Sequence, residues 1–168
     1  PLLAILYGLA VDHLISADVI LADGSAASFA AQSLASADYR AAGQGISAGL
    51  YSTALAIREK YAEPISANFP LTWRRVSGYN LNYLLPWSPA QPPLWADNCA
   101  DWLPAGEPPL PYPPIRPGEI NLASLLAGSE GTLALIHRAT LRMVPRPKHT
   151  LLGVLSYPGI AEACDAVP

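Results

Sequence analysis

The residues best suited to chemistry lie in the run Gly128-Ser129-Glu130-Gly131-Thr132, which combines two glycines, two hydroxyls and one carboxylate. Glycine adopts positive φ readily and lets a ligand approach the backbone without a Cβ in between. A turn of this composition exposes backbone N–H groups beside hydroxyl donors, which suits the phosphates or the ring edge of a nucleotide cofactor. The structural alternative is a tight helix-to-strand turn in which Gly128 closes the preceding helix.

A second group of candidate residues comprises Arg74, Arg75, Tyr79 and Asn80. A guanidinium group binds a carboxylate in a bidentate manner, so an arginine in this group could recognise an acidic substrate. The alternative is that both arginines are solvated surface side chains, which is the commoner arrangement for this residue type.

Two other kinds of chemistry are not predicted. A serine hydrolase built on Ser129 would need glycine two residues before and after it in a strand-to-helix turn, but position 127 is alanine and the predicted order is helix to strand. A metal site is not expected either, because the histidines are scattered and His13 has no partner ligand at helical spacing. Cys99 and Cys164 lie far apart without a CxxC motif, which fits a reducing compartment.

Length and composition fit one domain or part of one. The chain has 168 residues, of which 51% are hydrophobic, and can bury a single core. Its net charge of −3 and its lack of a dense Lys/Arg cluster argue against nucleic-acid binding. The apolar stretch 1–10 is too short to span a bilayer and lacks a basic leader, so we expect no transmembrane segment and a cytoplasmic protein.

Local patterns predict the elements that would position these residues. Asp23-Gly24 predicts a hairpin between the apolar run 19–21 and a returning strand at 28–29. The spacing of apolar residues predicts a helix over 47–61, with Ser47 as its N-cap and Pro64 beyond its end.

The second half of the chain is expected to be rich in strands. Residues 132–136 and 139–144 predict two strands joined by a turn at His137, and Pro145 and Pro147 then end the sheet. A further strand over 151–157 and a helix over 159–167 follow, with His149 at the joint.

Residues 86–117 differ from the rest, because they hold 11 of the 18 prolines and three of the four tryptophans. This composition disfavours helices and central strands, and we interpret it as a long surface insertion. It could act as a lid or as a partner-docking loop, or it could be an ordered loop fixed by Trp87, Trp95 and Trp102. Since loop closure costs only about 0.6 kcal/mol per doubling of length, we expect a short Gly/Ser bridge to replace 89–114 without loss of folding.

Three pieces of the sequence resemble, in order, the FAD-linked oxidases of the vanillyl-alcohol-oxidase (PCMH) type. They are YGLAVDH (7–13) with DVILADGS (18–25), RRVSGYNL (74–81), and LLAGSEGTL (125–133) with ATLRMVPRP (139–147). Three ordered matches are more specific than one glycine motif. The subgroup that the chain most resembles oxidises D-2-hydroxy acids such as D-lactate, glycolate and D-2-hydroxyglutarate.

The resemblance implies an α+β fold, namely the second subdomain of a PCMH-type FAD-binding domain with a mostly antiparallel sheet flanked by helices. Residues 1–147 would belong to this domain, with the insertion at 86–117, and residues 148–168 would begin a substrate-binding cap. Because the family's cofactor lies between two subdomains, we interpret the sequence as a fragment and expect it to be inactive when expressed alone.

The resemblance also implies a flavin site. The implied cofactor-binding residues are Tyr7, Gly8, Asp12, Gly128, Ser129, Glu130, Gly131, Thr132 and Ile136. Arg74, Arg75, Tyr79 and Asn80 would lie on the substrate side, and the family usually has glycine where this chain has Ala134. The catalytic base would come from the cap, so no catalytic residue is assigned, and the electron acceptor stays open, as does an iron–sulfur cluster in a further C-terminal domain.

Two functions therefore follow from the sequence. The first is an FAD-dependent oxidoreductase that transfers hydride from a D-2-hydroxy acid to the flavin. The alternative is a non-catalytic flavin-domain-like binding module whose Pro/Trp-rich segment docks a partner.

Overall fold

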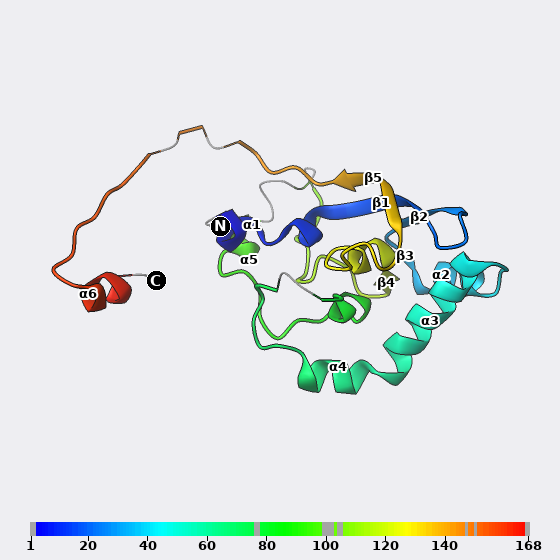
Figure 1. Ribbon diagram of the computed structural model, residues 1–168. Helices are drawn as coiled ribbons and strands as arrows, with labels where there is room; N and C mark the ends of the chain where they lie inside the picture. The colour runs from blue at the N-terminus through cyan, green and yellow to red at the C-terminus, as the bar shows by residue number, and fades with distance from the viewer. Residues whose placement is uncertain are drawn as a thin grey trace.

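The central element is a three-stranded antiparallel sheet with the strand order β2-β1-β5. Its strands are β1 (Leu14–Ile20), β2 (Ala26–Ala30) and β5 (Leu135–Leu141), which lie together in Figure 1. The computed structural model describes residues 3–75, 78–98, 103, 106–146, 148–149 and 151–166. Helices and antiparallel strands are thus combined in one chain.

The hairpin predicted at Asp23-Gly24 is confirmed. The Gly24 backbone has a φ of +82°, which glycine adopts without strain. The Asp23 carboxylate accepts hydrogen bonds from the backbone N–H and the hydroxyl of Ser25, at 2.9 and 2.6 Å. The hydrogen bonds between Asp23 and Ser25 therefore stabilise the turn that sets the register of the two strands, in which Ala17 pairs with Phe29.

The two strands predicted around His137 form one strand instead. β5 is a single strand through Leu135–Leu141 that pairs with β1, so His137 lies within a strand and not in a turn, at a shift in the register between Ile136 and Arg138. Arg138 lies opposite Asp18, and their charged groups are 3.9 Å apart. The polar pair at 137–138 resembles a turn signal in sequence. Every residue of β5 is exposed to solvent, so polar side chains are tolerated in the middle of this strand.

Two helices, α2 (Leu34–Ala41) and α3 (Ile46–Lys60), pack against one face of the sheet, and α4 (Ala62–Asn68) follows α3 and contacts it. The main core brings β1 and β2 residues together with α2 and α3, and the Phe29 and Tyr51 rings meet edge to face at 6.0 Å. The helix predicted over 47–61 is confirmed, but its N-cap is Gly45 and not Ser47. Pro64 lies in the first turn of α4, where its missing N–H is tolerated.

Several short elements complete the fold around the sheet and the glycine-rich turn at 128–132. They are α1 (Leu3–Tyr7), η1 (Ala10–His13), β3 (Gln32–Ser33), η2 (Leu81–Leu84), β4 (Glu119–Ile120) and η4 (Leu122–Leu125), with β3 and β4 paired antiparallel. Asn121 joins η4 to the sheet, because its side chain donates to the Ile15 carbonyl at 3.1 Å and accepts from the Ala123 N–H at 3.0 Å. The helix expected before the glycine-rich turn is this single 3-10 turn.

The Pro/Trp-rich insertion is packed and not simply a surface loop. It contains a short helix, α5 (Trp95–Asn98), where the composition had argued against any helix. Trp95 is 1% exposed, and Leu110 and Pro113 are buried with it. Trp95 therefore fixes the loop as expected, Trp87 is half-buried, and Trp102 lies outside the described residues. This burial argues against the expectation that 89–114 can be removed without loss of folding.

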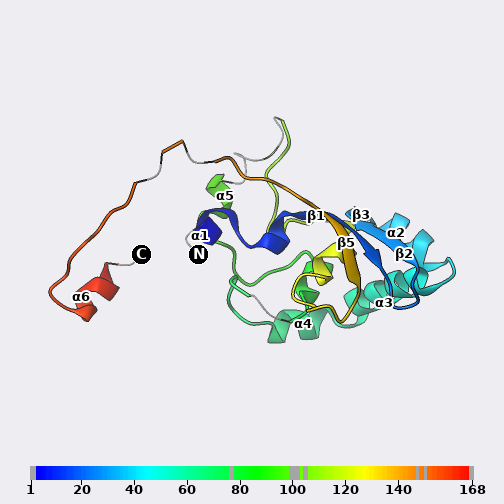
Figure 2. The same ribbon diagram turned by 45° about the horizontal axis from the view of Figure 1, so that its top comes forward.

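The C-terminal part projects from the rest of the chain, as Figures 1 and 2 both show. It ends in α6 (Ile160–Asp165), close to the predicted helix. The strand predicted over 151–157 is absent from the described structure: these residues are extended and exposed but have no neighbouring strand to share backbone hydrogen bonds. No helix in the described part of the chain is long and apolar enough to cross a membrane.

Candidate functional site

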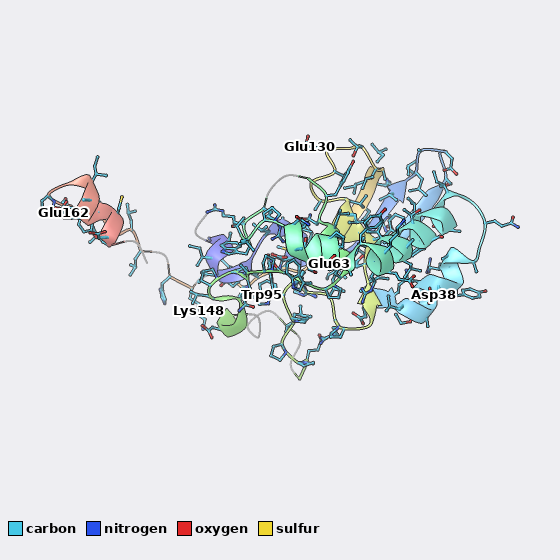
Figure 3. The ribbon with its side chains drawn as sticks, turned by 90° about the horizontal axis from the view of Figure 1, so that it is seen from below. Asp38, Glu63, Trp95, Glu130, Lys148 and Glu162 are labelled. Atoms are coloured by element: carbon cyan, nitrogen blue, oxygen red, sulfur yellow. The ribbon has the colours of Figure 1, made fainter. Side chains whose placement is uncertain are left out.

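The glycine-rich turn adopts a conformation that its glycines permit. Gly128 and Gly131 have φ values of +82° and +79°, and Glu130 between them has a φ of +51°. Positive φ is rare for a residue with a side chain, so Glu130 is strained, while the two glycines adopt this conformation freely. Glu130 projects outward at the surface (Figure 3).

The two hydroxyl groups of the turn are used within the turn itself. Ser129 is 4% exposed, and its Oγ donates to the Leu126 carbonyl at 2.8 Å. Thr132 Oγ1 donates to the Ser129 carbonyl at 2.6 Å. Because both hydroxyl hydrogens are already committed, donors to a ligand at this turn would have to come from the backbone.

The segment around Gly78 closes onto the turn. A Cβ at Gly128 would lie 2.4 Å from the Gly78 carbonyl oxygen, so the two backbones touch where no side chain fits. Asn80 Nδ2 donates to the Ala127 carbonyl at 2.9 Å. The Tyr79 hydroxyl lies 2.8 Å from Thr132 Oγ1, and it must be the donor because the Thr132 hydrogen points to Ser129.

A small cavity lies where the three resembling pieces of sequence meet. Its volume is about 210 Å³. The lining residues are Leu9, Ala10, Val11, Arg75, Gly78, Asn80, Ala127 and Gly128. The fold thus brings Arg75 and Asn80 from one motif and Gly128 from another to the wall of one cavity.

Arg75 gives this cavity a positive charge. Its Nη1 donates to the Thr72 carbonyl at 2.6 Å, and the guanidinium carbon lies 4.8 Å from the centre of the Phe69 ring. Its Nε is buried and finds no acceptor among the described residues. A buried N–H donor without a partner is costly, so this guanidinium is suited to an anionic group that enters from the cavity.

The residues that follow Gly8, Leu9 to Val11, form another wall of this cavity. Gly8 has a φ of +79°, and a Cβ there would lie 2.5 Å from Asp12 Oδ2. The Asp12 carboxylate accepts the Leu9 N–H at 2.7 Å and the hydroxyl of Tyr83. Because Asp12 is 1% exposed and satisfied by the chain, it shapes the turn and does not itself line a described cavity.

Burial dominates the ionisation of Asp12. Removal from water raises the pKa of this carboxyl from 3.8 to about 6, while the hydrogen bonds from Tyr83 and Leu9, the nearby Tyr112 hydroxyl and the charge of Arg75 act in the opposite direction. The same burial raises the pKa of the Tyr83 and Tyr112 hydroxyls, so both are neutral at neutral pH, and Tyr83 donates its hydroxyl hydrogen to Asp12.

Asp12 should make the stability of the fold pH-dependent. Its raised pKa favours the protonated folded form, so its contribution is fully present below 3.8 and lost as the pH rises through about 6. The shift corresponds to roughly 3 kcal/mol at 1.36 kcal/mol per pKa unit. We expect urea unfolding between pH 4 and 7 to show this slope, and Asp12→Asn to flatten it; an unchanged slope in Asp12→Asn would assign it to other groups.

Several predicted site residues lie away from the 210 Å³ cavity. Tyr7 ends α1, and its carbonyl accepts a hydrogen bond from His13 Nε2 at 2.7 Å. Arg74 is exposed, and Ile136 lies on the exposed strand β5. With Glu130 and Gly131, which are also exposed, these residues stay predictions as cofactor or substrate contacts.

Ala134, the departure from the family pattern, lines a different cavity. This one is apolar, has a volume of about 260 Å³ and lies between α3 and the glycine-rich turn. Tyr79 and Leu133 line it from the turn side, and Leu50 and Ile57 line it from α3. The extra methyl group therefore packs toward the apolar core in this structure.

Sequence reasoning missed the partners of Asp12. Tyr83 is 71 positions away in sequence, and Tyr112 lies within the insertion. One signal was available, because a carboxylate in the apolar run 3–15 must find donors if it is buried. Nothing in the sequence could say which hydroxyls would provide them. In the described part of the chain, no group of three or more His, Cys, Asp or Glu residues is placed to hold a metal ion.

The similarity to known proteins is short and partial. A stretch of 46 residues is 44% identical to a protein described as "Probable D-lactate dehydrogenase, mitochondrial" from Danio rerio. It covers 27% of this chain and 9% of that relative. No protein-family model matches the chain, and no solved structure matches it. The similarity links the chain loosely to D-lactate dehydrogenases, and so to oxidoreductases.

Proposed function

We propose that this chain forms part of the FAD-binding domain of a PCMH-type flavoprotein that oxidises a D-2-hydroxy acid. The observation that carries the proposal is the cavity at which the three resembling segments meet beside Arg75, whose buried Nε has no acceptor among the described residues. The similarity to a D-lactate dehydrogenase supports the same class of reaction.

The residues around the cavity fit a flavin and an acidic substrate. The backbone of Leu9–Val11 and of Gly128 forms a wall without projecting charges, which suits contact with a cofactor. Arg75 would hold the substrate carboxylate, because its Nε and the remaining guanidinium N–H groups can form charge-assisted hydrogen bonds. When bound, FAD would supply the acceptor for the hydride from the substrate α-carbon, which leaves a 2-oxo acid as the product.

The test uses the full-length protein that contains this chain. We expect it to purify with flavin absorbance and to lose that absorbance anaerobically on addition of D-lactate, glycolate or D-2-hydroxyglutarate. A protein that binds flavin but is bleached by none of them would contradict the substrate class. A protein that binds no FAD would contradict the whole proposal and favour the binding-module alternative.

Arg75→Gln should weaken substrate use in this enzyme. A hydrogen bond to a charged group contributes about 1.5–3 kcal/mol. Its loss predicts a fall in kcat/KM of roughly 10- to 100-fold for the best hydroxy acid, at 1.4 kcal/mol per tenfold. Flavin occupancy should stay close to that of the wild type.

Arg74→Gln is the matched control, because Arg74 carries the same charge one position away but does not line the cavity. We expect its kcat/KM to stay within about twofold of wild type, as for a solvated surface charge. Equal losses in the two variants would show a general electrostatic effect and remove Arg75 from the substrate site.

A further inference from the structure

We propose that Trp95 and Tyr112, both in the Pro/Trp-rich insertion, are positioning residues that hold the Gly8–Asp12 turn in the shape that admits the cofactor. The inference rests on the proposed function, in which this turn forms one wall of the flavin site. It gives the insertion a role at the site and not at a partner surface.

Trp95 is held in one orientation. Its side chain is 1% exposed, and its indole Nε1 donates to the Leu110 carbonyl at 3.1 Å. Its ring meets that of Tyr112 edge to face, with centroids 5.2 Å apart and planes at 69°. A ring fixed at its polar atom and at its edge has little freedom to move.

This fixed ring lies directly against the Gly8 turn. A Cβ at Gly8 would lie 2.9 Å from Trp95 Cζ3, so the indole occupies the space beside the glycine backbone. The Leu94 N–H also donates to the Ile5 carbonyl at 3.2 Å, which joins α5 to α1. Figure 3 labels Trp95 beside α5, close to the helix that precedes the turn.

Tyr112 packs against Trp95 and lies near Asp12 at the end of the same turn. Its hydroxyl is buried near Asp12 and Tyr83, but it makes no hydrogen bond to a described residue. Asp12 in turn accepts the Leu9 N–H, which fixes the first residue of the cavity wall. The groups that face the Asp12 carboxylate are therefore Tyr83, Tyr112 and the charge of Arg75.

These contacts form a continuous path from the insertion to the cavity. Trp95 packs on Gly8, Tyr112 borders Asp12, and the backbone between them lines the cavity through Leu9–Val11. Loosening either aromatic residue should therefore move the cavity wall before it disturbs the main core, which lies under the sheet and contains neither residue.

Amide hydrogen exchange on the full-length protein tests the local effect without any ligand. In Trp95→Phe we expect the Leu9 and Asp12 amides to exchange about tenfold faster, while amides in α3 keep the wild-type rate. Trp87→Phe is the matched control, since it changes a half-buried tryptophan of the same insertion that is not part of the Trp95 cluster. Unchanged exchange at Leu9 and Asp12, or an equal rise in α3, would overturn the proposal.

FAD titration of the apoprotein tests the consequence for the site. We expect the Kd for FAD to rise about tenfold in Trp95→Phe and severalfold in Tyr112→Phe, with kcat retained at saturating FAD. Ile65→Ala, a buried substitution in α4, provides a destabilised control whose Kd should not change. A Kd within twofold of wild type in both aromatic variants would overturn the inference, as would an equal rise in Ile65→Ala.

The two proposals fail in different ways. If wild-type protein binds no FAD, the proposed function is wrong, and the exchange rates at Leu9 and Asp12 still decide whether Trp95 holds the turn. If wild-type protein binds FAD but the aromatic variants bind it equally well, the proposed function stands and the positioning role is wrong.

Discussion

Gly128→Ala is expected to destabilise the fold by several kcal/mol. An alanine held at a φ of +82° costs about 1–2 kcal/mol from its backbone conformation alone. Its Cβ would also lie 2.4 Å from the Gly78 carbonyl oxygen, which is backbone and cannot rotate away. Relief requires the two segments to separate, and forced repacking of this kind typically costs about 1–3 kcal/mol more. Urea unfolding should show the loss directly.

Gly131→Ala is the matched control for this prediction. Gly131 has nearly the same φ, +79°, but a Cβ there meets no atom of the described residues within 4 Å. The conformational cost of about 1–2 kcal/mol should remain, while the cost of the collision disappears. Equal losses of unfolding free energy in the two variants would show that the positive φ accounts for the whole effect. The contact between Gly78 and Gly128 would then be loose in solution.

The same two variants also test whether the glycine-rich turn contacts FAD. If the backbone of Gly131 touches FAD as the family resemblance implies, Gly131→Ala should weaken flavin binding by more than its effect on stability explains. Normal FAD affinity in this variant would place the exposed side of the turn outside the cofactor site and leave the cavity beside Gly128 as the contact.

The sequence predicted correctly those elements that depend on interactions between residues close together in the chain. The Asp23-Gly24 hairpin is correct because its hydrogen bonds join residues two positions apart. α3 is correct within one residue at each end, although its N-cap proved to be Gly45, whose positive φ leaves no side-chain signal. The turn predicted at His137 is wrong. Residues on both sides of His137 pair with β1, and this long-range pairing could not be read from the local sequence.

The candidate site was predictable in its parts but not in its assembly. The glycines at 128 and 131 do require positive φ, as their composition suggested. The environment of Asp12 could not be foreseen, because its donor Tyr83 is 71 residues away and the neighbouring Tyr112 belongs to the insertion. Contacts of this range depend on the folded topology, which local patterns do not encode.

Replacing residues 89–114 with a short Gly/Ser bridge is expected to destabilise the protein strongly. The argument from loop entropy gave the opposite result, because it counts only the cost of closing the loop. The structure adds the side chains that would be lost: Trp95 is 1% exposed, and Leu110 is buried against it. Truncating one buried tryptophan typically costs about 3–5 kcal/mol. This is a large share of the roughly 5–15 kcal/mol that stabilises a domain.

The deletion should therefore lower the urea midpoint severely and expose the Gly8 turn on which Trp95 packs. The control replaces only residues 106–109, which are exposed, with Gly-Ser-Gly-Ser. Its main loss is the exposed Arg116–Glu107 pair at 3.4 Å, and exposed ion pairs contribute at most about 1 kcal/mol. A deletion variant as stable as this control would show that the tryptophan cluster is peripheral and restore the entropy argument. A large difference between the two would show that the insertion is part of the core that supports the site.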